Sequence, residues 1–198
     1  MNMKQTISLI LFLIACFAVS AQKIETRITW LATNPGTTDI IIYHPQKQLT
    51  IADFKGQPDA STDAVAITSS GFMFKAGYQS ENEKGILSLQ VYCSFNKNDS
   101  WMKERGKTAY ILAHEQRHFD ISYLSTLLFI KKVRQTNFQQ PDFMAQLRNI
   151  YKEIVQQMSE RQQQYDSETN NGINTTKQEE WNKRIEKDIA GLSKDVKL

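Results

Sequence analysis

Cysteine is scarce in this chain, with 2 in 198 residues. Cys16 lies in an N-terminal segment that we expect to be cleaved, which leaves Cys93 alone and excludes an intramolecular disulfide in the remaining chain. The paired-cysteine spacing of zinc ribbons is absent as well. Cys93 lies in 87–95, where side chains alternate as they do in a strand. This pattern predicts a small core residue, and we do not expect Cys93 to be a nucleophile.

A large charge of one sign is also lacking. The formal net charge is +3, and it falls to +2 if residues 1–21 are removed, because that segment holds Lys4 and no acidic residue. Such a balance gives no electrostatic reason to expect a nucleic-acid partner. The chain shows no internal repeat and no linker long enough to separate two domains. We therefore expect residues 22–198 to form a single domain with its own core.

The apolar run at 7–19 is too short for a comfortable membrane span. It follows Lys4 and ends in small residues, a pattern typical of a secretory signal peptide that comprises residues 1–21. An alternative is a lipoprotein anchored through Cys16, because Leu-Ile-Ala-Cys at 13–16 resembles a lipobox. In both cases we expect a secreted or periplasmic protein with no integral membrane span after cleavage.

The chain changes character near residue 100. Runs rich in β-branched or aromatic residues, separated by Gly- and Pro-containing turns, predict strands at 26–31, 40–43, 64–74 and 87–95. Apolar positions at helical spacing then predict helices at 108–133, from Pro141 to about 165, and around 181–192, with a turn at 170–172. Strands followed by helices indicate an α+β fold with an N-terminal β-rich part.

The segment 113–120 holds two of the three histidines in the pattern H-E-x-x-H. On a helix, His114 and His118 point the same way one turn apart, so that two imidazole nitrogens can bind one Zn²⁺. Glu115 projects beside them, where a carboxylate can take a proton from a water activated by the metal. The alternative is a buried helix whose histidines are only hydrogen-bonded. For the neighbours, we expect Arg117 to be solvated or ion-paired and Gln116 to serve orientation or packing.

Three stretches together resemble the bacterial secreted zinc-dependent proteases of the DUF922 family, within the zincin-like metallopeptidases. They comprise 49–58 with 66–72, 100–101 with 114–121, and 165–172 with Gln178 and Trp181. The resemblance implies a zincin-like domain in which the H-E-x-x-H helix carries the active site. It also implies a zinc hydrolase activity.

The third zinc ligand is not given by the motif. The extended pattern H-E-x-x-H-x-x-G-x-x-H is absent, because Ile121 and Leu124 stand at its last two fixed positions. The remaining histidine, His44, precedes a proline in the β-rich part and is expected in a loop or at a strand edge. In the family a histidine often precedes Gly172, but here that residue is Asn171, and asparagine is a poor zinc ligand.

A carboxylate can serve as the third ligand instead. Asp166 matches the family's motif and is our first choice, with Glu168 and Glu160 as alternatives. Asp120 lies about 200° around the helix from His118, so we expect it to bond another partner or the backbone. We place the second helix antiparallel to the first, which would bring the segment after Tyr165 beside the histidines.

These residues predict a zinc metallopeptidase that acts on a peptide or protein substrate. Its metal ligands are expected to be His114, His118 and Asp166, with Glu115 as the general base. Tyr165 is a candidate donor to the oxyanion, although packing is its commoner role. The alternative function is a catalytically degenerate family member, its third ligand lost at Asn171, that acts as a cell-envelope binding or structural protein.

Overall fold

The computed structural model describes residues 23–33, 36, 38–81 and 84–197. The predicted signal peptide and Cys16 lie outside the described residues. In chain order the elements are β1 (Ile24–Trp30), β2 (Ile40–Ile42), the short 3₁₀ helix η1 (Ile51–Asp53), β3 (Ala66–Ile67), β4 (Ser70–Glu81), β5 (Lys84–Asn96), β6 (Trp101–Met102), η2 (Glu104–Gly106), α1 (Ala109–Gln135), α2 (Phe143–Thr169) and α3 (Thr175–Val196). Strands come first and helices follow, so the α+β prediction is confirmed.

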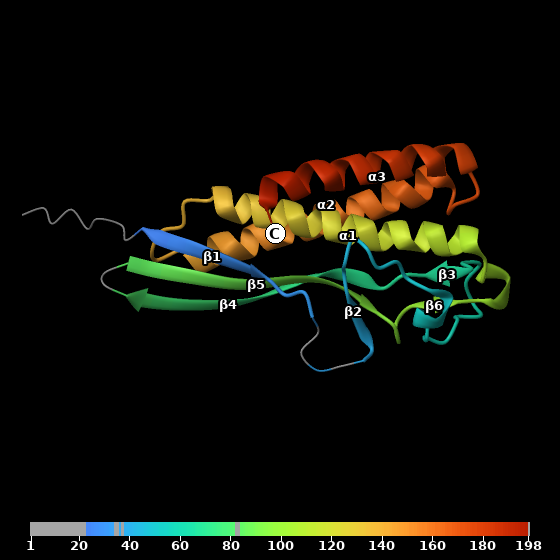
Figure 1. Cartoon of the computed structure of the whole chain (residues 1–198), viewed down its shortest axis with the longest axis horizontal. Helices are drawn as coiled ribbons and strands as arrows, with labels where there is room; N and C mark the ends of the chain where they lie inside the picture. The colour runs from blue at the N-terminus through green and yellow to red at the C-terminus, as the bar shows by residue number, and fades with distance from the viewer. Residues whose placement is uncertain (1–22, 34–35, 37, 82–83, 198) are drawn as a thin grey trace, which may run out of the picture.

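The main sheet is organised around β5. This strand pairs with β1 in parallel and, further along, with β2 in antiparallel fashion, while β4 runs antiparallel along its other edge. The short strands β3 and β6 form a separate two-stranded sheet. Figure 1 shows the three helices together on one side of the main sheet. The sheet and the helices therefore form two layers, and the core lies between them.

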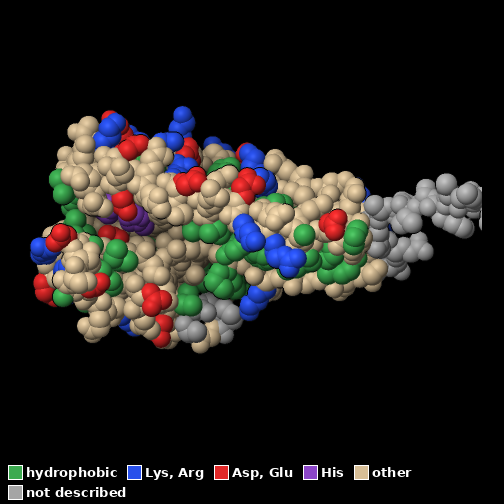
Figure 2. Space-filling model, turned by 180° about the vertical axis from the view of Figure 1, so that it is seen from behind, with side chains coloured by type: hydrophobic (Ala, Val, Ile, Leu, Met, Phe, Trp, Pro, Cys, Tyr) green, Lys and Arg blue, Asp and Glu red, His purple; other side chains and the backbone are tan. Residues whose placement is uncertain are grey.

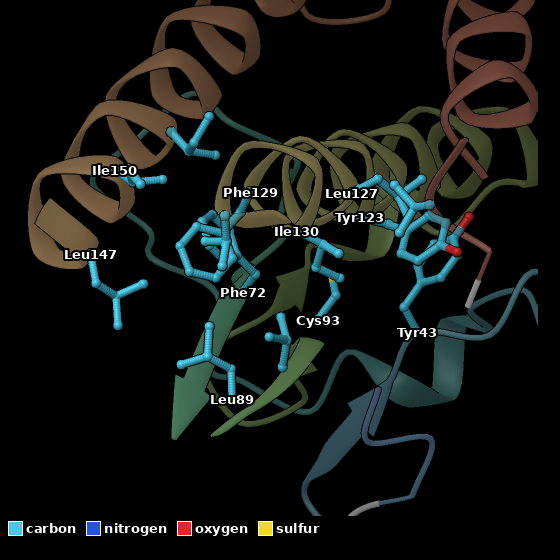
Figure 3. Close-up of a cluster of buried hydrophobic side chains, with 14 of the residues drawn as sticks. Tyr43, Phe72, Leu89, Cys93, Tyr123, Leu127, Phe129, Ile130, Leu147 and Ile150 are labelled. Atoms are coloured by element: carbon cyan, nitrogen blue, oxygen red, sulfur yellow. The ribbon is translucent and has the colours of Figure 1, made fainter. Parts of the chain in front are cut away.

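The core is built from the inward face of β5. Alternate residues Leu87, Leu89, Val91, Cys93 and Phe95 are at most 1% exposed, as expected for a strand with one buried face. They pack against apolar side chains of the helices, several of which are drawn in Figure 3. The prediction that Cys93 is a core residue is confirmed, and burial raises the pKa of its thiol. The thiol therefore stays protonated at neutral pH.

Helix α1 occupies the centre of the molecule. It contacts the sheet on one side and α2 and α3 on the others, so its middle is buried around most of its circumference. Helix α2 returns along α1 and ends beside its start, where the hydroxyl of Tyr165 donates to the backbone oxygen of His114 over 3.3 Å. The start of α3 lies at the same end, because only the short turn 170–174 separates it from α2. Three helix segments thus meet near residue 114.

The prediction of one strand at 64–74 is wrong. The structure divides this region into β3 and β4, because Thr68 and Ser69 leave the strand to bond elsewhere: the Thr68 hydroxyl donates to the backbone oxygen of Glu115, and the Ser69 amide donates to the Ser100 hydroxyl. β4 also runs on to Glu81, well past the predicted end, since it pairs with β5 along its whole length. Within the described residues, no helix is long and apolar enough to cross a membrane.

Candidate metal centre

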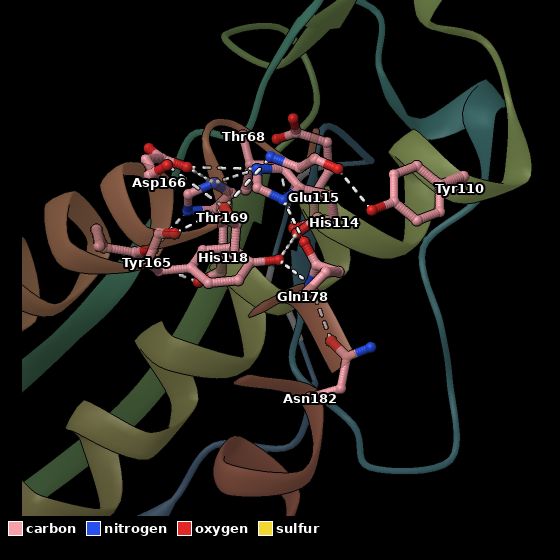
Figure 4. Close-up of polar contacts among 12 residues, drawn as sticks. Thr68, Tyr110, His114, Glu115, His118, Tyr165, Asp166, Thr169, Gln178 and Asn182 are labelled. Atoms are coloured by element: carbon pink, nitrogen blue, oxygen red, sulfur yellow. Dashed lines mark hydrogen bonds and ion pairs between the residues drawn. The ribbon is translucent and has the colours of Figure 1, made fainter. Parts of the chain in front are cut away.

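The first turns of α1 carry the two motif histidines. The hydroxyl of Thr108 accepts from the amide of Ile111 and caps the helix, which fixes where its turns begin. His114 and His118 then project to the same side, and their Nε2 atoms lie 3.3 Å apart. Both side chains are largely buried, at 5% and 14% exposure. The helical spacing thus produces the paired imidazoles that the sequence predicts (Figure 4).

Asp166 completes a group of three. Its Oδ1 lies 3.3 Å from Nε2 of His114 and 3.0 Å from Nε2 of His118. Among the described residues, these three side chains form the group whose donor atoms are close enough together to hold one metal ion. The antiparallel return of α2 brings Asp166 there, as the helix arrangement inferred from the sequence requires. Its role as a metal ligand stays a prediction.

Gln162 fixes the tautomer of His118. Its amide nitrogen donates to the backbone oxygen of His118 over 2.9 Å, and a carbonyl can only accept. The amide oxygen of Gln162 therefore faces Nδ1 of His118, at 2.5 Å, and accepts a hydrogen bond from its N–H group. The neutral imidazole then carries its lone pair on Nε2, toward Asp166. Gln162 and Asp166 are four residues apart on α2 and share one face of the helix.

A longer chain of hydrogen bonds fixes His114. The Nε atom of Arg117, which can only donate, bonds the side-chain oxygen of Asn182 at 3.0 Å. That oxygen also accepts from the amide nitrogen of Gln178 at 2.9 Å, so the amide oxygen of Gln178 faces Nδ1 of His114 at 2.8 Å. His114 is therefore protonated on Nδ1, with its lone pair on Nε2 as well. Partners of this kind orient metal-binding histidines and select their tautomer.

The three converging atoms fit a metal ion. Two imidazole nitrogens and a carboxylate oxygen face one another at 3.0–3.3 Å, and if both imidazoles are neutral and protonated on Nδ1, all three atoms present lone pairs. Three lone pairs at this distance repel unless a cation joins them, either a proton or a metal. In a tetrahedral zinc site, bonds of about 2.0–2.1 Å separate the ligand atoms by about 3.3–3.4 Å. The observed separations are close to that requirement.

The site also shifts the ionisation of its members. Burial alone would raise the pKa of Asp166, but its hydrogen bonds to the imidazoles of His114 and His118, and its electrostatic attraction to them, outweigh burial and hold this pKa well below its ordinary value. Burial would lower the pKa of His118, yet the bond to Asp166 and the nearby charge of Glu115 raise it overall. The pocket therefore favours an ionised carboxylate beside a positive charge.

The other predicted candidates lie away from this point. The carboxylate of Glu168 accepts from Gln164 and from the Trp181 indole, and Glu160 accepts from a glutamine on its own helix. Asp120 accepts from Tyr43, Gln116 and Arg117, which agrees with the partner-bonding role expected for it. His44 is exposed in a loop, where its Nδ1 accepts from the Gln46 amide. Among the described residues, none of these four side chains belongs to the group formed by His114, His118 and Asp166.

Glu115 and the candidate metal-binding group of His114, His118 and Asp166 open onto one cavity of about 940 Å³. Glu115 is 5% exposed and lies beside the histidines, as Figure 4 shows. Figure 2 shows histidine side chains, in purple, in a recess beside acidic side chains on one face of the molecule. Tyr165 takes the packing role: it is fully buried, stacks on His114 with ring centroids 4.7 Å apart, and receives a hydrogen bond from Gln178. Its hydroxyl does not face the cavity.

The turn after α2 closes one end of the cavity. Asn170, Asn171 and Gly172 all have positive φ, at 49°, 50° and 83°. A Cβ at Gly172 would lie 3.2 Å from Nδ1 of His114, closer than ordinary contact, so both the backbone conformation and the space favour glycine. Asn171 lines the cavity near Asp166, whose backbone oxygen accepts from its amide at 2.8 Å. Asn171 thus lies beside the candidate metal-binding group without belonging to it.

Gln162 and Gln178 are the site residues that the sequence did not assign. Gln162 could have been found from its position four residues before Asp166, on the same helix face. Gln178 is 5% exposed, and its place on the apolar face of α3 near Trp181 is the signal that a buried polar partner is needed there.

The fold and the site together define an α+β protein with a candidate two-histidine, one-aspartate metal centre. A family model described as a bacterial protein of unknown function, DUF922, matches residues 96–172. This match supports the family resemblance for the segment from the end of β5 to the turn after α2, which contains His114, Glu115, His118 and Asp166 but not Gln178. No curated protein and no solved structure matches the chain.

Proposed function

We propose that the protein is a zinc-dependent peptidase, exported to the periplasm or the medium, that hydrolyses peptide bonds. The observation that carries this proposal is the convergence of three potential ligand atoms, from His114, His118 and Asp166, at 3.0–3.3 Å beside a carboxylate that lines the same cavity. Zinc bound there would act as a Lewis acid, lowering the pKa of water and polarising a carbonyl.

The protein's own groups would perform the remaining steps. Glu115 would accept the proton of the attacking water on a carboxylate oxygen and then pass it to the leaving amine. Gln162 and Gln178 would keep the two Nε2 lone pairs directed at the metal by holding the Nδ1 protons. The buried ring of Tyr165, stacked on His114, would exclude water from behind the site.

The test compares matched variants of the chain 22–198. Metal content is measured for zinc, iron and manganese separately, because two histidines and one carboxylate also suit iron(II). Glu115→Gln should retain zinc and lose about 10²- to 10⁴-fold in the rate of cleavage of a quenched fluorescent peptide pool. Glu160→Gln is the control, since Glu160 is an exposed acid outside the site. A wild-type rate of cleavage by Glu115→Gln would contradict the role of Glu115 as general base. Wild-type protein that contains no zinc would contradict the proposed zinc site.

A second candidate function rests on Asn171. If the histidine that the family often carries there is needed for turnover, this chain would bind zinc and peptide without hydrolysis, as a binding protein of the cell envelope. Zinc binding together with an absence of cleavage by the wild-type protein would favour this function. Export itself is tested by N-terminal sequencing, where the proposed cleavage gives a mature chain that starts at Gln22.

A further inference from the structure

The cavity is partly apolar. Besides the candidate metal-binding group, it is lined by Ile67 of β3, Ile111 of α1, Met158 of α2 and Ile173 of the turn that leads to α3. Four separate parts of the chain thus bring aliphatic side chains to the space that the histidines and Glu115 face. A concave apolar surface with a few polar groups is the usual form of a ligand site.

Two of these side chains are exposed to an unusual degree. Ile173 is 75% exposed and Ile67 is 43% exposed. Six large apolar side chains are exposed within the described residues, and Ile173 is the most exposed of them. Single exposed apolar residues are normal on a protein surface, but a group around a cavity indicates a binding surface.

Ile173 is held in place. Its amide donates to the backbone oxygen of Asn170 at 3.1 Å, which closes the turn. The preceding residue, Gly172, packs on the ring of His114, and its oxygen accepts from the hydroxyl of Tyr110 at 2.5 Å. These bonds fix the backbone of the turn relative to His114, and with it the point from which the side chain of Ile173 projects. Ile173 therefore belongs to a backbone-anchored part of the cavity lining.

We propose that the apolar wall formed by Ile67, Ile111 and Ile173, which belong to segments that meet near His114 and Glu115, is the subsite for one bulky apolar side chain of an extended peptide, such as leucine, phenylalanine or methionine. The nature of this occupant rests on the proposed function, which supplies a peptide bound next to Glu115. A cavity of about 940 Å³ has room for such a side chain together with the neighbouring backbone. Burying it should strengthen binding by about 10- to 100-fold over serine at the same position.

The experiment measures binding without turnover. Zinc-loaded Glu115→Gln protein is titrated into fluorescein-labelled hexapeptides of alanine with one variable residue, either leucine, phenylalanine, serine or glutamate, and anisotropy is recorded. The leucine and phenylalanine peptides should bind best. Adding Ile173→Ser should remove most of this preference, and because Ile173 is mainly exposed, the change should leave folding and zinc content intact. Met73→Ser is the control, since Met73 is 52% exposed on β4 and does not line the cavity.

Equal binding of all four peptides would overturn the subsite, and so would an equal effect of Ile173→Ser and Met73→Ser. The outcome is separable from that of the proposed function. Cleavage by the wild-type protein with no apolar preference refutes the subsite alone. An apolar preference in binding that Ile173→Ser removes, with no cleavage by the wild-type protein, supports the subsite and refutes the peptidase.

Discussion

Gln178 is expected to control zinc affinity from outside the ligand set, and Gln178→Met tests this. Methionine has a similar volume, so the change removes hydrogen bonds without opening a large cavity. Gln178 bonds His114, Tyr165 and Asn182. Tyr165 still donates to a backbone oxygen and Asn182 still accepts from an arginine, which leaves Nδ1 of His114 as the group without a partner.

An unpaired buried donor costs about 1–3 kcal/mol, which is the expected loss in the free energy of unfolding of the metal-free protein. Loss of the partner that orients a metal-binding histidine weakens metal binding by about 10- to 100-fold, so the zinc dissociation constant should rise by that factor. Urea unfolding with a chelator present measures the first quantity. Competition with a chromophoric chelator measures the second.

The matched control is Gln164→Met, because Gln164 is exposed on α2 and bonds only the carboxylate of Glu168, at 2.7 Å. It should change neither quantity appreciably. If Gln178→Met binds zinc as tightly as Gln164→Met, the argument that Gln178 sets the tautomer of His114 is wrong. A loss of stability with unchanged zinc affinity would give Gln178 a purely structural role.

The remaining predictions concern ionisation and the turn. The pKa of Asp166 is lowered in the folded protein, so the stability it contributes is present above about pH 4 and is lost as the pH falls through its folded pKa. The pKa of His118 is raised, so the stability it contributes is complete below about pH 6.5 and is lost as the pH rises through its folded pKa. In chelator, urea unfolding should therefore show the largest stability difference between wild type and Asp166→Asn between these limits, and a difference that is constant from pH 3 to 9 would contradict it. Gly172→Ala should lower the free energy of unfolding by about 1–3 kcal/mol, because Gly172 has a φ of 83° and lies next to the imidazole of His114. The control Gly191→Ala, on open helix surface, should raise the free energy of unfolding by about 0.5–1 kcal/mol. An unchanged free energy of unfolding in Gly172→Ala would show that the turn can move. Asn171→His should leave zinc affinity unchanged in chelator competition, since Asp166 already stands between the histidines, and a gain would mean that this chain lacks a ligand.

Local patterns in the sequence predicted most of the helical half of the fold. Residues 108–133 have no glycine or proline, and the observed α1 differs from that range by one residue at its start and two at its end. The strands were predicted less well, because the outer part of β4 carries mainly polar residues that are exposed in the structure. Hydrophobic periodicity is informative only where one face is buried.

The sequence by itself determined the histidine pair, because residues four apart on a helix share a face whatever surrounds them. It left three acids of α2 as candidates for the third ligand, and only the tertiary structure separated them. Asp166 shares a helix face with Gln162, which contacts His118, whereas Glu168 is about 200° further around the helix and bonds Trp181. The partners Gln162 and Gln178, and the apolar wall with Ile173, were likewise decided by the packing of α1, α2 and α3. Contacts between distant segments depend on how whole helices pack, and periodicity within one segment does not contain that information.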